Sequence, residues 1–90
     1  MASNFKLFTH ETGNSIHMKM YGDFDGTSAC ELITEIQRHV RKSNQVFIHT
    51  ENIDNIYSFG RGVFHNNLGV LKKQSNKIVF VGKHKDSLIL

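Results

Sequence analysis

Hydrophobic and polar residues alternate in two segments near the start of the chain. Residues 4–10 place Phe5 and Leu7 on one face, and residues 15–21 place three apolar side chains opposite polar ones. A period of two residues is typical of strands that bury one face. The intervening residues Glu11-Thr12-Gly13-Asn14 include two types that tolerate a positive φ angle, so we expect an antiparallel hairpin.

The pattern then changes to a helical period. Ser28-Ala29-Cys30-Glu31 fits a capping box, in which the serine hydroxyl and the glutamate satisfy free amides, so a helix is expected to begin at Ser28. Acidic residues come early and basic residues late, as the helix dipole favours. The apolar stripe of this helix consists of Ala29, Leu32, Ile33, Ile36 and Val40.

Two short apolar runs lack alternation. Residues 45–50 contain Val46-Phe47-Ile48, and residues 77–82 contain Ile78-Val79-Phe80-Val81. Such runs are typical of strands covered on both faces. The first run follows a helix that itself followed a strand, so the sequence predicts a βαβ unit.

A second helix is expected over residues 58–74. Its apolar stripe is Val63, Phe64, Leu68 and Leu71, although Gly62 and Gly69 each cost about 1 kcal/mol relative to alanine. The predicted fold is therefore α/β, with a mixed, largely parallel sheet, an N-terminal β-hairpin and the order β-β-α-β-α-β.

Composition agrees with one folded domain over residues 1–90. The chain has 39% hydrophobic residues, a net charge of +3 and one cysteine, Cys30. Apolar stretches are far shorter than the roughly 20 residues of a membrane span, and nothing calls for disulfides. We therefore expect a cytoplasmic protein without membrane insertion. The basic residues are too dispersed to predict nucleic-acid binding.

Candidate chemistry is sparse. The six histidines show no strand or helix spacing typical of metal ligands, so we expect surface histidines and no metal site, with a zinc site built from distant histidines as a remaining alternative. Asp23 and Asp25 are the only paired carboxylates, and shaping the turn before a helix accounts for them better than acid–base catalysis. No phosphate-binding loop or catalytic motif is present, so neither an enzyme nor a cofactor is expected.

Ser58 lies where a loop enters the second helix. It is an ordinary candidate for the N-cap. A hydroxyl at this position can also be a phosphorylation site, because a phosphate is stabilised by free amides, with Arg61 one turn further on as a counter-charge. Both interpretations stay open on chemistry alone.

The chain resembles the STAS domain family of anti-sigma factor antagonists. The resemblance spans about residues 5–82 and rests on the order of elements, on Gly22-Asp23-Phe24-Asp25 and on Ile56-Tyr57-Ser58-Phe59-Gly60. In that family the second motif is commonly Asp-Ser-Ser-Gly, so Ser58 aligns with the phospho-acceptor and Gly60 with the glycine. Tyr57 and Phe59 replace the acid and the second serine. The chain ends at Leu90, before the family's usual C-terminal helix, so Leu88, Ile89 and Leu90 could belong to a shortened element.

The resemblance implies a bacterial signalling domain whose partner is a serine kinase or anti-sigma factor. On that basis the candidate phospho-acceptor is Ser58, and the candidate partner-binding residues are Asp23, Phe24, Asp25, Tyr57, Phe59, Gly60 and Arg61. The alternative is a STAS-like domain without a phospho-switch, which acts as a constitutive protein-interaction or small-ligand-binding module.

Overall fold

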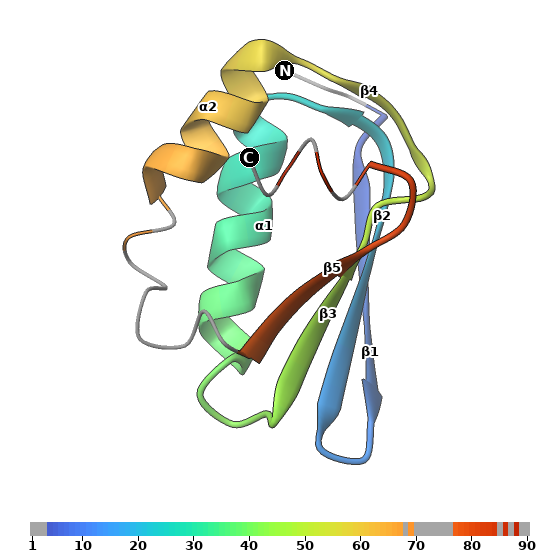
Figure 1. The fold of residues 1–90 in the computed structure, drawn as a ribbon, viewed down its shortest axis with the longest axis vertical. Coiled ribbons are helices and arrows are strands. Elements are labelled where there is room, and N and C mark those ends of the chain that lie inside the picture. Colours follow the sequence, from blue (N-terminus) through green and yellow to red (C-terminus); the bar gives the residue numbers. More distant parts are fainter. Residues whose placement is uncertain (1–3, 68, 70–76, 85, 87, 89–90) are drawn as a thin grey trace.

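The computed structural model describes residues 4–67, 69, 77–84, 86 and 88. The elements follow the order β-β-α-β-β-α-β, which is the expected order with one additional strand (Figure 1). Their bounds are β1 Lys6–Thr12, β2 Ser15–Phe24, α1 Gly26–His39, β3 Gln45–His49, β4 Ile53–Ile56, α2 Ser58–Asn67 and β5 Ile78–Val81.

The sheet is mixed, as the sequence predicts. The part of the chain that the structure describes contributes five strands: four lie in the order β1-β2-β3-β5, and β4 pairs with the C-terminal end of β2. Among the described residues, only the β1–β2 hairpin is antiparallel, whereas β2–β3, β2–β4 and β3–β5 are parallel. In the hairpin turn Gly13 has a φ of 59°, which suits the first central position of a type II′ turn.

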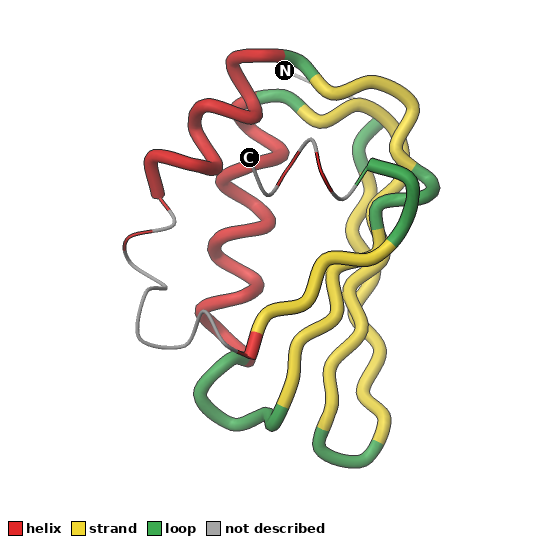
Figure 2. The backbone as a smooth tube through the Cα atoms, in the orientation of Figure 1, coloured by secondary structure: helices red, strands yellow, loops and turns green. Residues whose placement is uncertain are grey.

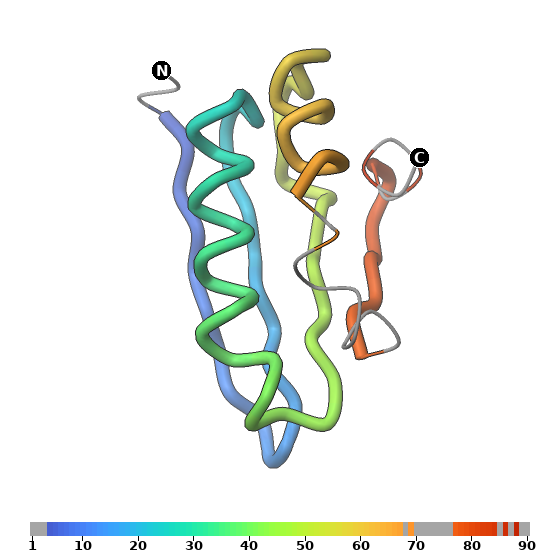
Figure 3. Tube along the Cα trace, turned by 90° about the vertical axis from the view of Figure 1, so that its left-hand side faces the viewer, coloured from blue at the N-terminus to red at the C-terminus, as the bar shows by residue number. Residues whose placement is uncertain are grey.

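Both helices lie on the same face of the sheet, as two perpendicular views show (Figures 1 and 3). The chain passes from β2 through α1 to β3, and from β3 through α2 to β5, so the two crossovers advance in the same direction across the sheet. When two crossovers have the same hand and move in the same direction across a sheet, their helices lie on the same face of that sheet.

The expectation that β3 and β5 are covered on both faces is therefore wrong. In β3, Val46 and Ile48 face the helices and are buried, while Phe47 and His49 on the opposite face are only half-buried. All four residues of β5 are half-buried. We call the uncovered side the open face of the sheet.

The core lies between the sheet and the two helices. It combines the alternating residues of β2 with the predicted stripe of α1 and with Phe64 of α2. Phe24 contacts Phe5 and Phe64 in edge-to-face geometry, and Phe64 contacts Phe80 in the same way. Of the predicted stripe of the second helix, Phe64 is buried and Val63 half-buried, while Leu68 and Leu71 lie outside the described residues.

Helix α1 begins two residues before the expected position. Asp25 is its N-cap, and its carboxylate accepts a hydrogen bond from the Ser28 backbone N–H at 2.9 Å. Ser28 is instead a buried residue of the first turn, and its hydroxyl donates to the Asp23 carbonyl oxygen at 2.9 Å. The capping-box interpretation was wrong because an aspartate three residues earlier already satisfies the free amide.

The C-terminal part of the chain is described only in places. Leu88 is fully buried, and its carbonyl oxygen lies 2.6 Å from Nε2 of His65 on α2. Ile89 and Leu90, the remainder of the shortened element considered above, lie outside the described residues. Among the described residues, no helix is long and apolar enough to cross a membrane.

Candidate functional site

The two loops that carry the family-like motifs meet at one end of the molecule. Strand β2 leads into α1 and strand β4 leads into α2, and both helix entries lie at the same end of the sheet (Figure 2). Phe24 is the register partner of Ile56, and the Tyr57 N–H donates to the Phe24 carbonyl oxygen at 3.0 Å. The parallel β2–β4 pairing thus fixes one loop against the other.

Two glycines make this contact close. A Cβ atom built on Gly60 would lie 2.6 Å from the carbonyl carbon of Asp25. A Cβ atom on Gly26 would lie 2.8 Å from the ring of Phe59. Glycine is therefore required at Gly60, where the neighbouring atoms are backbone, whereas a side chain at Gly26 would displace the exposed Phe59 ring.

The two acidic residues have structural partners. Besides capping α1, the Asp25 carboxylate lies 3.0 Å from the Ser28 hydroxyl. The Asp23 carboxylate accepts a hydrogen bond from the Asn55 side-chain amide at 2.9 Å, which links the two loops again. These contacts agree with the turn-shaping role expected from the sequence.

Phe24 does not belong to an accessible surface. Its side chain is fully buried in the core, so the expectation that it contacts a partner is wrong. Gly60 is buried as well and acts through the close helix contact. The alternation of β2 continues through Gly22 to Phe24, and this period of two is the sequence signal that would have placed Phe24 inside.

The remaining predicted residues form an exposed surface around the start of α2. Tyr57 and Phe59 are 49% and 75% exposed, and Ser58 and Arg61 are exposed beside them. Two shallow grooves flank Phe59, one lined by Asp25, Thr27, Cys30 and Val63, the other by Ser58, Gly62, Val63 and Asn66. We call Tyr57, Ser58, Phe59 and Arg61 the Phe59 surface.

Ser58 is not the N-cap of α2. The Arg61 N–H donates to the Tyr57 carbonyl oxygen at 3.0 Å, so the first helical hydrogen bond starts from Tyr57, and Ser58 is the first residue inside the helix. Its hydroxyl has no hydrogen bond to any described residue. The capping explanation of Ser58 therefore fails, because the residue lies one position too late.

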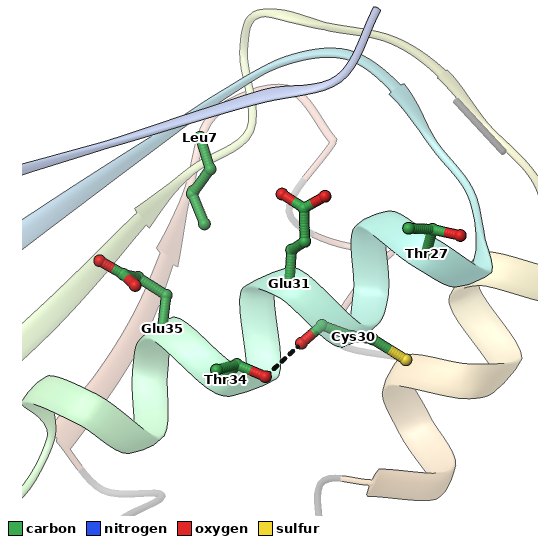
Figure 4. Close-up of a pocket in the computed structure, with 6 residues that line it drawn as sticks. All are labelled: Leu7, Thr27, Cys30, Glu31, Thr34 and Glu35. Carbon is green, nitrogen blue, oxygen red and sulfur yellow. Dashed lines mark hydrogen bonds between the residues drawn. The ribbon is translucent and has the colours of Figure 1, made fainter. Parts of the chain in front are cut away.

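A further groove runs between β1 and the outer side of α1 (Figure 4). It is lined by Leu7, Thr27, Cys30, Glu31, Thr34 and Glu35. The Cys30 sulfur points toward α2, and its backbone carbonyl accepts a hydrogen bond from the Thr34 hydroxyl at 2.9 Å. Burial opposes ionisation of Glu35, but hydrogen bonds from Thr9 and His39 and the nearby Arg38 charge outweigh it and lower the pKa of Glu35.

The open face brings two distant histidines together. His17 Nδ1 on β2 lies 3.0 Å from His49 Nε2 on β3. Partial burial lowers the pKa of His17, and the neighbouring His49, His10 and Lys19 lower it further. Sequence spacing could not reveal this pair, because the residues lie on separate strands that are joined by a helix. Within the described part of the chain, no group of three or more histidine, cysteine or acidic side chains is arranged to hold a metal ion.

No protein-family model and no curated protein sequence matches the chain. Solved structures do. The anti-sigma factor antagonist SpoIIAA in its unphosphorylated form superposes with a TM-score of 0.59 at 14% identity, over 84% of this chain and 70% of SpoIIAA. An uncharacterized DUF3478-family protein with a SpoIIAA-like fold from Shewanella loihica PV-4 superposes with a TM-score of 0.59 at 13% identity, over 92% of this chain and 72% of that protein.

The chain is also similar to one part of a larger protein. Mglu superposes with a TM-score of 0.71 at 13% identity, over 87% of this chain, but this match covers only 20% of the Mglu chain. At identities of 13–14% these likenesses concern architecture alone. Together with the hairpin, the parallel crossovers and the paired helix entries, they establish that the chain has a STAS-like fold of the SpoIIAA type.

Proposed function

We propose that the chain is a non-enzymatic regulatory domain that binds a protein partner through the Phe59 surface. The observation that carries the proposal is the exposure of two aromatic side chains on either side of Ser58, Tyr57 at 49% and Phe59 at 75%, at the entry of α2. Exposed apolar groups of this kind often belong to interfaces, and aromatic residues supply a large share of interface energy. The STAS-like fold supports a partner of the serine kinase or anti-sigma factor type in a bacterial cytoplasm.

Phosphorylation of Ser58 is the proposed switch. The hydroxyl is exposed and lies in the first turn of α2, where free amides and the helix dipole tolerate a phosphate, and exposed Arg61 follows one turn later. Modification therefore leaves the helix intact. It places a charge of about −1.5 to −2 between Tyr57 and Phe59, which weakens apolar docking.

A constitutive interaction module is the second candidate. It is favoured by the two aromatic residues themselves, because they occupy the positions where the resembling family carries an acid and a second serine. In this alternative Tyr57 and Phe59 form a permanent docking surface, and Ser58 is only a small residue between them.

Partner capture tests the surface that both candidates share. The intact chain, a Phe59→Ala variant and a Phe8→Ala variant would each be used to capture proteins from native lysate, followed by identification of the captured proteins. Phe8 is a matched control, since it is 56% exposed but lies on β1. We expect one protein to bind the intact chain and Phe8→Ala but not Phe59→Ala. Equal capture by all three forms would contradict the proposed surface.

Mass spectrometry and Ser58 variants separate the two candidates. For the switch, protein isolated from its native host carries a phosphoryl group on the peptide containing Ser58. Ser58→Ala then retains the partner, while Ser58→Glu loses it. Absence of the modification under all growth conditions, together with equal partner binding by both variants, would reject the switch and retain the constitutive module.

A further inference from the structure

The open face of the sheet carries a pair of imidazoles with a defined arrangement. His17 on β2 and His49 on β3 point to the same side of two adjacent parallel strands, and the register pairs His17 with Phe47 and Lys19 with His49. The Phe47 ring stacks on the His17 ring with centroids 4.8 Å apart and an interplanar angle of 14°. Strand pairing and this stacking restrict the positions that the His17 ring can adopt.

The distance between the two ring nitrogens matches that of two ligands on one metal ion. His17 Nδ1 and His49 Nε2 are 3.0 Å apart. Bonds of about 2.0–2.1 Å from each nitrogen to a metal, meeting at a right angle, require the nitrogens to lie about 2.9 Å apart. The two imidazole rings are stacked, with centroids 5.2 Å apart and an interplanar angle of 27°, so a turn about χ2 is needed to bring both lone pairs onto one ion. A right angle between two nitrogens is typical of tetragonal Cu²⁺ and Ni²⁺ sites.

A carboxylate lies behind one of the two rings. Glu51 Oε2 is 3.6 Å from His49 Nδ1, the nitrogen that faces away from His17. When His49 carries its proton on Nδ1, Nε2 has a free lone pair and the N–H is directed toward Glu51. Metal-binding histidines commonly have such a carboxylate, which orients the ring and increases its basicity.

We propose that His17 and His49 form a binding site for a divalent transition-metal ion on the open face, with Glu51 as the positioning residue. The ion takes His17 Nδ1 and His49 Nε2 as adjacent ligands and replaces the hydrogen bond between them, while water fills the remaining positions. Lys19 and His10 are the cationic or titratable neighbours of His17, and they disfavour a dication, whereas Glu51 favours it. Binding consequently requires both imidazoles to be neutral and weakens as the pH falls.

Isothermal titration of the untagged chain with Ni²⁺ tests the site. We expect binding of one ion per chain. His17→Gln and His49→Gln, which keep a polar side chain, should each abolish it. His39→Gln is the control, since His39 interacts with Glu35 on α1 and should retain full affinity. Glu51→Gln should bind with about 10–100-fold lower affinity and unchanged stoichiometry.

Thermal unfolding supplies a second measurement, because an ion that binds only the folded chain raises the melting temperature. Ni²⁺ should raise it for the intact chain and for His39→Gln, but not for the His17 and His49 variants. A dissociation constant of about 1 mM or weaker for the intact chain would overturn the proposal. Unchanged binding by both His17→Gln and His49→Gln would overturn it as well. Folding of each variant is checked by circular dichroism.

Discussion

Gly60 lies directly against the backbone of Asp25, the N-cap of α1, and a Cβ atom at Gly60 would approach three Asp25 backbone atoms to 2.6–2.7 Å. This contact joins the starts of the two helices. Because the opposing atoms belong to the backbone, they cannot move aside as the end of a flexible side chain would. The Phe59 surface therefore depends on a residue that is not itself exposed.

Gly60→Ala should lower the free energy of unfolding by about 1–3 kcal/mol, because the methyl group forces the helix entries apart. Gly62 offers a matched control on the same helix, since no atom lies within 4 Å of its Cβ position. Gly62→Ala should raise stability by about 0.4–1 kcal/mol. Urea unfolding measures both variants, and a Gly60→Ala protein as stable as Gly62→Ala would contradict the close contact.

Asp25→Ala should lower the free energy of unfolding by about 0.5–2 kcal/mol, because the Ser28 N–H loses its acceptor. Asp25→Asn keeps a side-chain oxygen at the cap and should stay near the intact chain. Thermal or urea unfolding of the two variants gives the comparison. If the asparagine variant lost as much stability as the alanine variant, capping would not be the role of Asp25.

Leu32→Ala should lower the free energy of unfolding by about 2–5 kcal/mol, because Leu32 is fully buried between α1 and the sheet. Gln37→Ala is the control, since this residue is exposed on the same helix and should change stability by less than about 0.5 kcal/mol. Urea denaturation measures both. Similar stabilities for the two variants would contradict the packing of α1.

Stability should fall as the pH decreases through the ordinary histidine pKa of 6.5. The folded chain holds the pKa of His17 below 6.5, so the unfolded chain takes up a proton first. The contribution of His17 is therefore complete above 6.5 and is lost as the pH falls toward its lower pKa in the folded state. His17→Gln should flatten this dependence, which urea unfolding at several pH values measures. If the free energy of unfolding of His17→Gln depended on pH as strongly as that of the intact chain, the lowered pKa of His17 would be contradicted.

Local patterns predicted the hairpin and α1, because each rests on periodicity within a short segment. Strand β4 was missed, since its four residues, Ile53–Ile56, show no alternation and become a strand only by pairing with the end of β2. The run Val46-Phe47-Ile48 suggested burial on both faces. Phe47 instead stacks on His17 at the surface, an interaction between strands that no local pattern contains.

The candidate site was predictable in position but not in detail. The sequence placed Ser58 at a helix entry near Asp23 and Asp25, and the structure brings these loops together. The sequence could not show whether Ser58 is the N-cap or the first helical residue. That difference of one position depends on which carbonyl accepts the first helical hydrogen bond, and the structure shows that it is the carbonyl of Tyr57. The His17–His49 pair was equally invisible, since it depends on strand register across a crossover.

Strand β2 pairs with three other strands, β1, β3 and β4. The first pairing is local and needs only a two-residue turn, whereas the other two must close loops that include the whole of α1. Contacts between residues far apart in the sequence form slowly, so the β1–β2 hairpin can form before β3 and β4 pair with β2. Among the described strands, β1, β3 and β4 each pair with β2, so none of the three can dissociate without β2 losing a partner, and we expect these four strands to unfold as one cooperative unit.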